Sequence, residues 1–311
     1  MVGGERSDSG FALVLALMVS LIITTTAIVL TQRVRGQVEM ARQFGDRTQA
    51  EMKIREATAQ LLLTMITSQA GATGLEEAEW SEGSSGLALA DGTESQPWNY
   101  YGEPFLLGPG ITVTLQDSAA RLAVSTPALD LLKPLMTFHG VSSSRANTIL
   151  DSFRDWQDAD DFHHLNGAEE DYYIKKLGRT QGPRNDSMQS LGEMGLLRGM
   201  DTTLLNLLAQ DLTFYPTNHF NPMNTSITLL SALSTPEAAE QVASHRRAGT
   251  LTSGIFSAIT AISESETLFF SPGGRFEVTI VAEVGEARAI RSFLLIMKEG
   301  VGRPFRMTEW R

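Results

Sequence analysis

The stretch FALVLALMVSLIITTTAIVLT, residues Phe11–Thr31, decides the architecture of this chain. It runs for 21 residues without a charged side chain. As an α-helix it would be about 31 Å long, close to the thickness of about 30 Å of a bilayer's hydrocarbon core. Its Ser and Thr residues are compatible with lipid, because a helical hydroxyl can donate to the carbonyl one turn earlier. The sequence therefore predicts a single membrane-spanning helix.

A cleaved secretory signal is the alternative for this segment. Such signals have an apolar region of about 7–15 residues followed by a small-x-small cleavage site. Here the apolar run is longer, and Gln32–Arg35 follow it without such a site. The positive-inside rule would place the part after the span in the cytoplasm, because Arg33, Arg35 and Arg42 follow it, but the rule weakens when a long domain follows. The sequence favours a retained span and leaves its orientation open.

Composition restricts the function of the remaining chain. The length of 311 residues suits about two domains. With 36 acidic and 25 basic residues the formal net charge is −11, which disfavours nucleic-acid binding because affinity for phosphates needs clustered Lys and Arg. The absence of Cys excludes disulfides, thiolate metal sites and cysteine nucleophiles. The motifs of dinucleotide, ATP, serine-hydrolase and zinc-protease sites are also missing, so no enzyme is predicted.

Residue periodicity predicts the secondary structure after the span. Residues 32–68 continue as a helix with one apolar stripe, formed by Ile54, Ala57, Leu61 and Met65. Alternation of apolar and polar residues predicts a strand over Ile111–Asp117 and two more over 276–284 and 287–297. Between the last two, Gly285-Glu286 is suited to a two-residue type II′ turn. A short last strand is expected over 304–310, and helices and loops fill 118–270.

Two similar helical units lie inside this helical region, over 126–153 and 221–247. In each unit a short helix opened by Thr, Asn or Ser precedes a second helix that ends near a basic residue, as in helix-hairpin-helix or SAM-like units. Binding of a DNA backbone by such hairpins uses a Gly-x-Gly turn. The first unit offers only His139–Ser142 and the second only Leu233–Pro236, so the units are interpreted as protein-contact modules.

Acidic residues are concentrated in residues 151–171, which hold eight acids and a single base, Arg154. Ca²⁺ takes six to eight oxygen ligands, and the spacing of these acids differs from that of an EF-hand loop. A solvated acidic loop and paired catalytic carboxylates are the alternatives. His163 and His164 are expected on a surface loop. The candidate ligands of Ca²⁺ are Asp155, Asp158, Asp160, Asp161, Glu169 and Asp171.

The start of the span resembles the type IV prepilin signal, in which a small residue precedes an aromatic that opens the apolar helix. The resemblance implies that prepilin peptidase cuts between Gly10 and Phe11, so that residues 1–10 form a leader. Most members of that family carry Glu at the fifth mature position, where this chain has Leu15. A carboxylate inside the membrane needs a partner, and in the family the partner is the new amine of a neighbouring subunit. Leu15 needs no such neighbour.

The order of several segments resembles the type II secretion system protein K family. The segments are DWQDADD (Asp155–Asp161), GAEEDYY (Gly167–Tyr173), LGEM (Leu191–Met194) and NPMNTS (Asn221–Ser226). The resemblance implies an α+β fold with a pilin-like long N-terminal helix on a small antiparallel sheet and a large all-α insertion. The expected parts are the leader 1–10, the span 11–31, a pilin-like part 32–117, the insertion 118–270 and C-terminal strands 271–311.

The same resemblance implies a non-catalytic minor pseudopilin that primes and caps the tip of a pseudopilus. It would be a single-pass protein of the inner membrane with its C-terminal domain in the periplasm. Its partners would be other minor pseudopilins, the major pseudopilin and prepilin peptidase, with exoprotein or the outer-membrane channel as further candidates. The alternative is a membrane-anchored DNA receptor of the competence type that uses the helical units.

Overall fold

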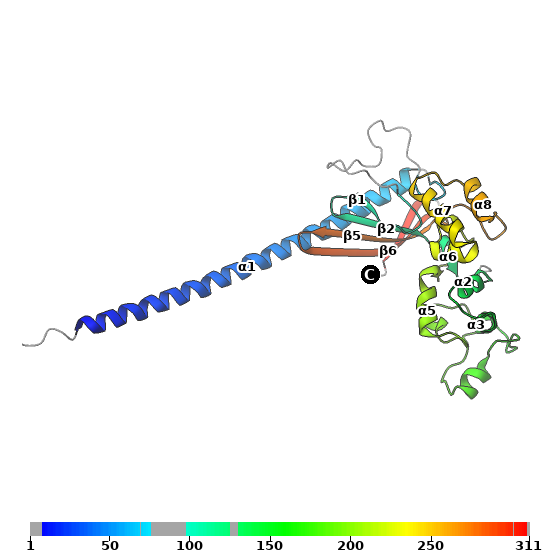
Figure 1. Cartoon of the computed structure of the whole chain (residues 1–311), viewed down its shortest axis with the longest axis horizontal. Coiled ribbons are helices and arrows are strands. Elements are labelled where there is room, and N and C mark those ends of the chain that lie inside the picture. Colours follow the sequence, from blue (N-terminus) through cyan, green and yellow to red (C-terminus); the bar gives the residue numbers. More distant parts are fainter. Residues whose placement is uncertain (1–7, 69, 76–97, 125–129, 301, 310–311) are drawn as a thin grey trace, which may run out of the picture.

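The computed structural model describes residues 8–68, 70–75, 98–124, 130–300 and 302–309. One long helix, α1 (Asp8–Thr67), projects from a head that contains a sheet and a group of short helices (Figure 1). The sheet lies along the second half of α1, and the short helices lie beyond it, at the end farthest from the N-terminus. The molecule therefore has the form of a rod with a broad head.

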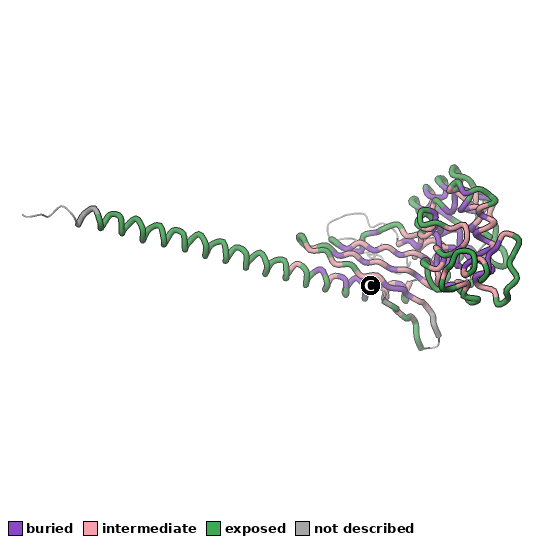
Figure 2. Tube along the Cα trace, turned by 90° about the horizontal axis from the view of Figure 1, so that it is seen from below, coloured by how far each residue is buried: buried purple, intermediate pink, exposed green. Residues whose placement is uncertain are grey.

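The first half of α1 is exposed from Phe11 onward (Figure 2). The helix contains an 18-residue window with a mean hydropathy of 2.7, none of which is buried inside the molecule, so by length and composition it can cross a membrane. The hydroxyls of Thr24, Thr25, Thr26 and Thr31 each donate to the carbonyl four residues earlier, at 2.7 or 2.8 Å. These bonds satisfy the hydroxyls within the helix, as a lipid environment requires.

The second half of α1 packs on an antiparallel five-stranded sheet of order β1-β2-β5-β6-β7. The predicted stripe of Ile54, Ala57, Leu61 and Met65 is buried, with exposed fractions of 7% or less. It faces alternate residues of the strands, such as Val113 and its register partner Ile280, which are both fully buried. The strands are β1 (Phe105–Gly108), β2 (Ile111–Asp117), β5 (Arg275–Val284), β6 (Ala287–Gly300) and β7 (Arg303–Glu309).

The strands predicted over 111–117, 276–284 and 287–297 are confirmed as β2, β5 and β6. The turn between β5 and β6 explains the register of these two strands. Val284 pairs with Ala287, which leaves Gly285 and Glu286 as a two-residue turn. Gly285 has a φ of +56°, whereas the φ of Glu286 is not positive. A type I′ turn requires a positive φ at both central residues and a type II′ turn only at the first, so the turn fits type II′. Of the five strands of this sheet, β1 is the one that the sequence analysis missed. It is short and pairs with β2 at the edge of the sheet.

The chain between β2 and β5 leaves the sheet and forms the helical part of the head. Two short strands in it, β3 (Leu122–Ala123) and β4 (Leu212–Thr213), pair in parallel. The helices are α2 (Leu132–Phe138), α3 (Ser143–Gln157), the π-helix η3 (Asp171–Lys176), α4 (Leu191–Met194), α5 (Thr202–Leu208), α6 (Ile227–Leu233), α7 (Pro236–Arg247) and α8 (Ser253–Thr260).

Two helix pairs occupy the positions of the predicted helical units. α2 and α3 are joined by a turn in which Gly140 has a φ of +79°. α6 and α7 are joined through Thr235, whose side chain caps α7 by accepting from the backbone N–H of Ala238 at 3.2 Å. Residues 126–129 of the first unit lie outside the described residues. The pairs are helical hairpins, and their membership of the helix-hairpin-helix or SAM-like class stays a prediction.

A buried carboxylate connects the helical part to the sheet. Asp117, the last residue of β2, has no exposed surface and accepts hydrogen bonds from the backbone N–H groups of Ala119 and Gly273, at 3.0 and 3.1 Å. It also accepts from the side chain of Asn221 at 3.2 Å. Asn224 donates to the carbonyl of Ala72, just after α1, at 2.9 Å. Hydrogen bonds therefore join both ends of the insertion to the sheet and to the end of α1.

Candidate metal centre

The C-terminal turn of α3 carries the centre of the acidic region. Ser142 caps the start of this helix, and Asp158 ends it. Phe153 and Trp156 point into the core of the helical part, with exposed fractions of 1% and 3%. Asp155 lies between them in sequence and is itself fully buried. A carboxylate in such a place is costly unless donors or a cation compensate its charge.

Two carboxylates of α3 fold the following loop back onto the helix. Asp155 Oδ1 accepts from the backbone N–H of His164 at 2.9 Å and lies 2.5 Å from Nδ1 of the same residue. One turn earlier, Asp151 Oδ2 accepts from the backbone and the side-chain nitrogen of Asn166, at 3.1 and 2.9 Å. The loop between Asp158 and Gly167 is therefore fixed at its far end. The end of this loop, at His164 and Asn166, therefore lies beside Asp151 and Asp155 of α3.

Several buried carboxylate oxygens of this region have no hydrogen-bond donor among the described residues. They are Asp155 Oδ2, Asp158 Oδ1 and both oxygens of Glu169. Buried polar atoms are almost always hydrogen-bonded, so these four oxygens are candidate ligands of a cation. Gly167 leaves room for one of them, because a Cβ at this position would lie 1.8 Å from Asp155 Oδ2.

Three side chains of this region are close enough together to bind one metal ion. Asp155, Asp158 and His164 each offer one ligand atom, and these atoms lie within 4.8 Å of one another. Ca²⁺ binds oxygens at about 2.3–2.6 Å, so two of its ligands are at most about 5 Å apart. Carboxylate oxygens predominate here, which favours a hard cation over a transition metal. His164 can support such an ion by holding the other oxygen of Asp155.

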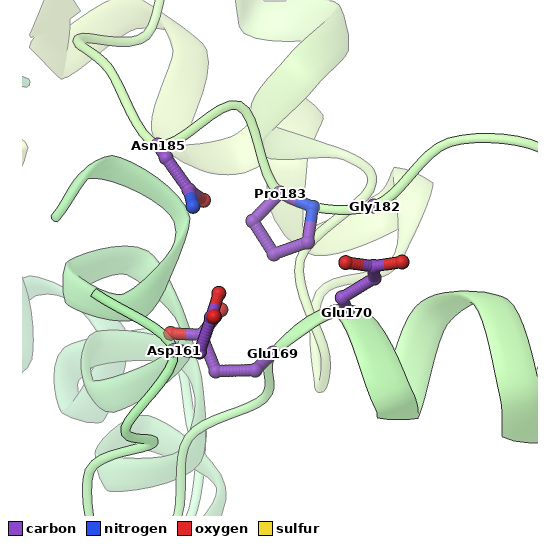
Figure 3. A pocket seen from close by; sticks show the side chains of 6 residues that line it. All are labelled: Asp161, Glu169, Glu170, Gly182, Pro183 and Asn185. Carbon is purple, nitrogen blue, oxygen red and sulfur yellow. The ribbon is translucent and has the colours of Figure 1, made fainter. Parts of the chain in front are cut away.

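A cavity of about 110 Å³ adjoins these residues and is lined by Asp161, Glu169, Glu170, Gly182, Pro183 and Asn185. The carboxylates of Asp161 and Glu169 lie on one side of it, facing Asn185, whereas Glu170 points toward Gly182 (Figure 3). Burial raises the pKa of Glu169 to about 7, and the negative charges of Asp155, Asp158, Asp161 and Asp160 add to the effect. The same two causes raise the pKa of Asp158. A bound cation would reverse this balance.

The structure brings five of the six candidate ligands together. Asp155, Asp158 and Glu169 supply buried oxygens, Asp161 lines the cavity, and the charge of Asp160 acts on Glu169. Asp171 does not line the cavity: it is exposed at the first position of η3. The sequence analysis missed the contact of His164 with Asp155, because adjacent histidines on a loop give no signal of which one turns inward.

The predicted cleavage site lies at the start of α1. Gly10 and Phe11 fall within its first turn, and Phe11 is 73% exposed. Residues 1–7 of the expected leader lie outside the described residues. Cleavage between Gly10 and Phe11 therefore stays a prediction.

The comparisons with known proteins all concern type II secretion. Residues 112–217, which include the whole acidic region, match the family described as type II secretion system (T2SS), protein K. The type II secretion system protein K of Dickeya chrysanthemi is 32% identical over 111 residues, which are 34% of this chain and 30% of the relative. The matched stretch therefore spans less than a third of that relative.

A solved structure shares the fold over most of the molecule. It is described as the crystal structure of the GspK-GspI-GspJ complex from the type 2 secretion system of enterotoxigenic Escherichia coli. Its similarity has a TM-score of 0.51 at 19% identity and covers 88% of this chain and 97% of the other. Over residues 112–217 the chain is thus similar to the type II secretion system protein K family, and most of the molecule shares its fold with a chain of that complex.

Proposed function

We propose that the protein is a minor pseudopilin that primes and caps the tip of a periplasmic pseudopilus. The observation that carries this proposal is the rod-and-head form: the first half of α1 is exposed and apolar, and the second half bears a folded head. Large apolar surfaces that stay exposed are found at interaction sites and in membranes. This half can be embedded first in lipid and then among the helices of neighbouring subunits.

The shape of the head supports a place at the end of a filament. The helical part lies beyond the C-terminal end of α1 and extends to one side of the rod axis (Figure 1). A subunit stacked above would meet this bulk. Leu15 fits the same position, because an apolar residue there requires no partner from a subunit above.

The partners follow from the proposed place in the assembly. The related GspK was solved together with GspI and GspJ, and we propose that other minor pseudopilins likewise bind this chain. The major pseudopilin would follow below the tip, prepilin peptidase would process the N-terminus, and exoprotein or the outer-membrane channel would meet the head. The protein would be anchored in the inner membrane, with the head in the periplasm. Its role would be structural rather than catalytic.

Processing of the N-terminus gives the test of this proposal. Mass spectrometry of the membrane-embedded protein should find Phe11 as the first residue. Gly10→Leu should block processing and secretion, because the resemblance calls for a small residue there. Gly36→Leu is the matched control, since a Cβ at Gly36 would meet no atom within 4 Å. An intact Met1 in a strain that secretes normally would contradict the proposal.

Calcium binding is the second part of the proposal. Asp155, Asp158, Asp160, Asp161 and Glu169 would surround a Ca²⁺ ion, which supplies the positive charge that these acids otherwise lack. The residues of the chain fix the loop from Asp158 to Gly167 around it, through the hydrogen bonds of Asp151 and Asp155. The ion would thereby stabilise the outer part of the head.

We propose that the helix pairs α2–α3 and α6–α7 act in protein contacts. α2 and α6 touch each other, so that the pairs pack together rather than standing apart as two separate hairpins. The alternative of a DNA receptor gains no support from the family and the relatives described above. Retention on immobilised duplex DNA at low salt would revive it.

A further inference from the structure

Positively charged side chains gather around two neighbouring tyrosines of the π-helix η3. Lys176 Nζ lies 5.3 Å from the ring centre of Tyr172, and the guanidinium carbon of Arg198 lies 4.9 Å from the same centre. The guanidinium carbon of Arg179 lies 5.4 Å from the ring centre of Tyr173. Residues 172–185 contain four basic and no acidic side chains, in a chain with a net charge of −11. Lys175, Lys176, Arg179 and Arg198 are here called the basic cluster.

The two arginines of the basic cluster are held in place. Arg179 Nη1 donates to the carbonyl of Leu196 at 2.7 Å, and Arg198 Nη1 donates to the carbonyl of Gly167 at 2.9 Å. The hydroxyl of Tyr173 accepts from the backbone N–H of Arg198 at 3.2 Å. A guanidinium that is fixed by a ring and a carbonyl loses little freedom when it binds an anion. Each of these arginines keeps further N–H groups for such a ligand.

The basic cluster differs from several other arginines of the head in its lack of carboxylate partners. Arg121, Arg145, Arg154 and Arg184 each form an ion pair with an acidic residue. In the part of the chain that the structure describes, no carboxylate oxygen lies within 4.0 Å of a cationic nitrogen of the basic cluster. The surplus of acids elsewhere makes this lack of pairing conspicuous.

We propose that the basic cluster is the docking site for a short acidic segment of a partner protein. Planar guanidinium groups bind carboxylates with two parallel hydrogen bonds. Leu177 and Leu196 adjoin the cluster and are 47% and 42% exposed, so they offer apolar contacts to the same segment. The surface therefore suits a peptide with alternating acidic and apolar side chains.

The surroundings of the basic cluster select a short segment over an extended polyanion. Residues 151–171 hold eight acids and one base and end directly before Tyr172. A nucleic acid or an anionic membrane would bring negative charges against this region as well as against the cluster. Screening at physiological salt acts over about 8 Å, so a segment of a few residues avoids this repulsion. The site goes beyond the proposed tip function and does not require it.

Fluorescence anisotropy on the detergent-solubilised full chain tests the proposal. The probe is a fluorescein-labelled peptide with the repeat Glu-Glu-Leu, and the same peptide with Gln in place of Glu is the uncharged comparison. The wild-type protein should bind the acidic peptide and not the Gln peptide. Lys175→Glu together with Lys176→Glu should weaken binding by about tenfold or more, since both side chains are exposed and reversal turns attraction into repulsion.

The matched control is the pair Arg55→Glu and Arg303→Glu, which changes the net charge equally at two exposed positions outside the cluster. It should bind the peptide as the wild type does. Arg179→Gln, with its melting temperature measured alongside, should also weaken binding. Equal loss in the control pair, unchanged binding in the cluster variants, or tighter binding to phosphatidylglycerol vesicles or duplex DNA than to the peptide would each overturn the proposal.

Discussion

If the acidic residues around Asp155 bind calcium, Asp155→Asn should have opposite effects on stability with and without the ion. Asp155→Asn keeps the shape of the side chain and an oxygen for the N–H of His164. Ligand atoms of Asp155 and Asp158 lie within 4.8 Å of each other. At an effective dielectric constant of about 20, two unit negative charges 4.8 Å apart repel by about 3.5 kcal/mol. In a chelator, removal of one charge should therefore stabilise the protein.

In calcium the order of stabilities should reverse. An ion at 1,000 times its dissociation constant stabilises the wild type by about 4.1 kcal/mol, which exceeds the repulsion removed by the substitution, and the variant loses most of this gain along with a ligand. For a chain of this size about 1 kcal/mol corresponds to roughly 2 °C in melting temperature. We therefore expect Asp155→Asn to melt up to about 7 °C above the wild type in chelator and below it in calcium.

Differential scanning fluorimetry of the detergent-solubilised full chain, in chelator, calcium or magnesium, measures this reversal. Asp171→Asn is the control, because Asp171 is a nearby acid that is exposed and does not line the cavity. Its response to calcium should match that of the wild type. The reasoning is refuted if the wild type melts at the same temperature in chelator and in calcium, or if Asp155→Asn is the less stable protein in chelator.

Further predictions concern the loop, the core, the junction and the span. Gly167→Ala should abolish the calcium-dependent rise in melting temperature, because its Cβ would lie 1.8 Å from Asp155 Oδ2; a normal rise would contradict the site. Leu61→Ala should lower the free energy of unfolding in chemical denaturation by about 2–5 kcal/mol, since Leu61 is fully buried between α1 and the sheet. Burial raises the pKa of Asp117, so stability should fall as pH rises from the usual pKa of Asp to the raised value, and titration of Asp117→Asn should lack this component. Leu15→Glu should not produce extended homopolymers in electron micrographs, and long filaments would refute the capping role.

Local patterns in the sequence were sufficient for much of the fold. Buried positions of α1 follow a three- and four-residue period, and those of β2 and β5 alternate, because each element has one face on the common core. The β5–β6 turn could be located because Gly285 needs a positive φ. β1 was missed because it is short and its pairing with β2 depends on a neighbour rather than on its own pattern.

The candidate metal centre was only partly predictable. The density of acids in 151–171 is visible in the sequence, and it indicates a cation because like charges repel. Which oxygens are buried without donors, and that His164 rather than His163 contacts Asp155, depends on how the loop folds back on α3. Lys175, Lys176 and Arg179 of the basic cluster are close together in the sequence, whereas Arg198 joins them from a separate segment.

By itself, the sequence determined the rod, four strands of the main sheet (β2, β5, β6 and β7) and the acidic character of the head, because hydrophobic period and charge are properties of consecutive residues. Only the tertiary structure decided which side chains meet. Asp117 with Asn221, Asp155 with Gly167 and Arg198 with Tyr172 are contacts whose distances depend on the packing of the whole head. Burial also raises the pKa of Glu169 to about 7. The charged form of a carboxyl group is disfavoured only where the folded chain excludes water from it, so this shift depends on the tertiary structure.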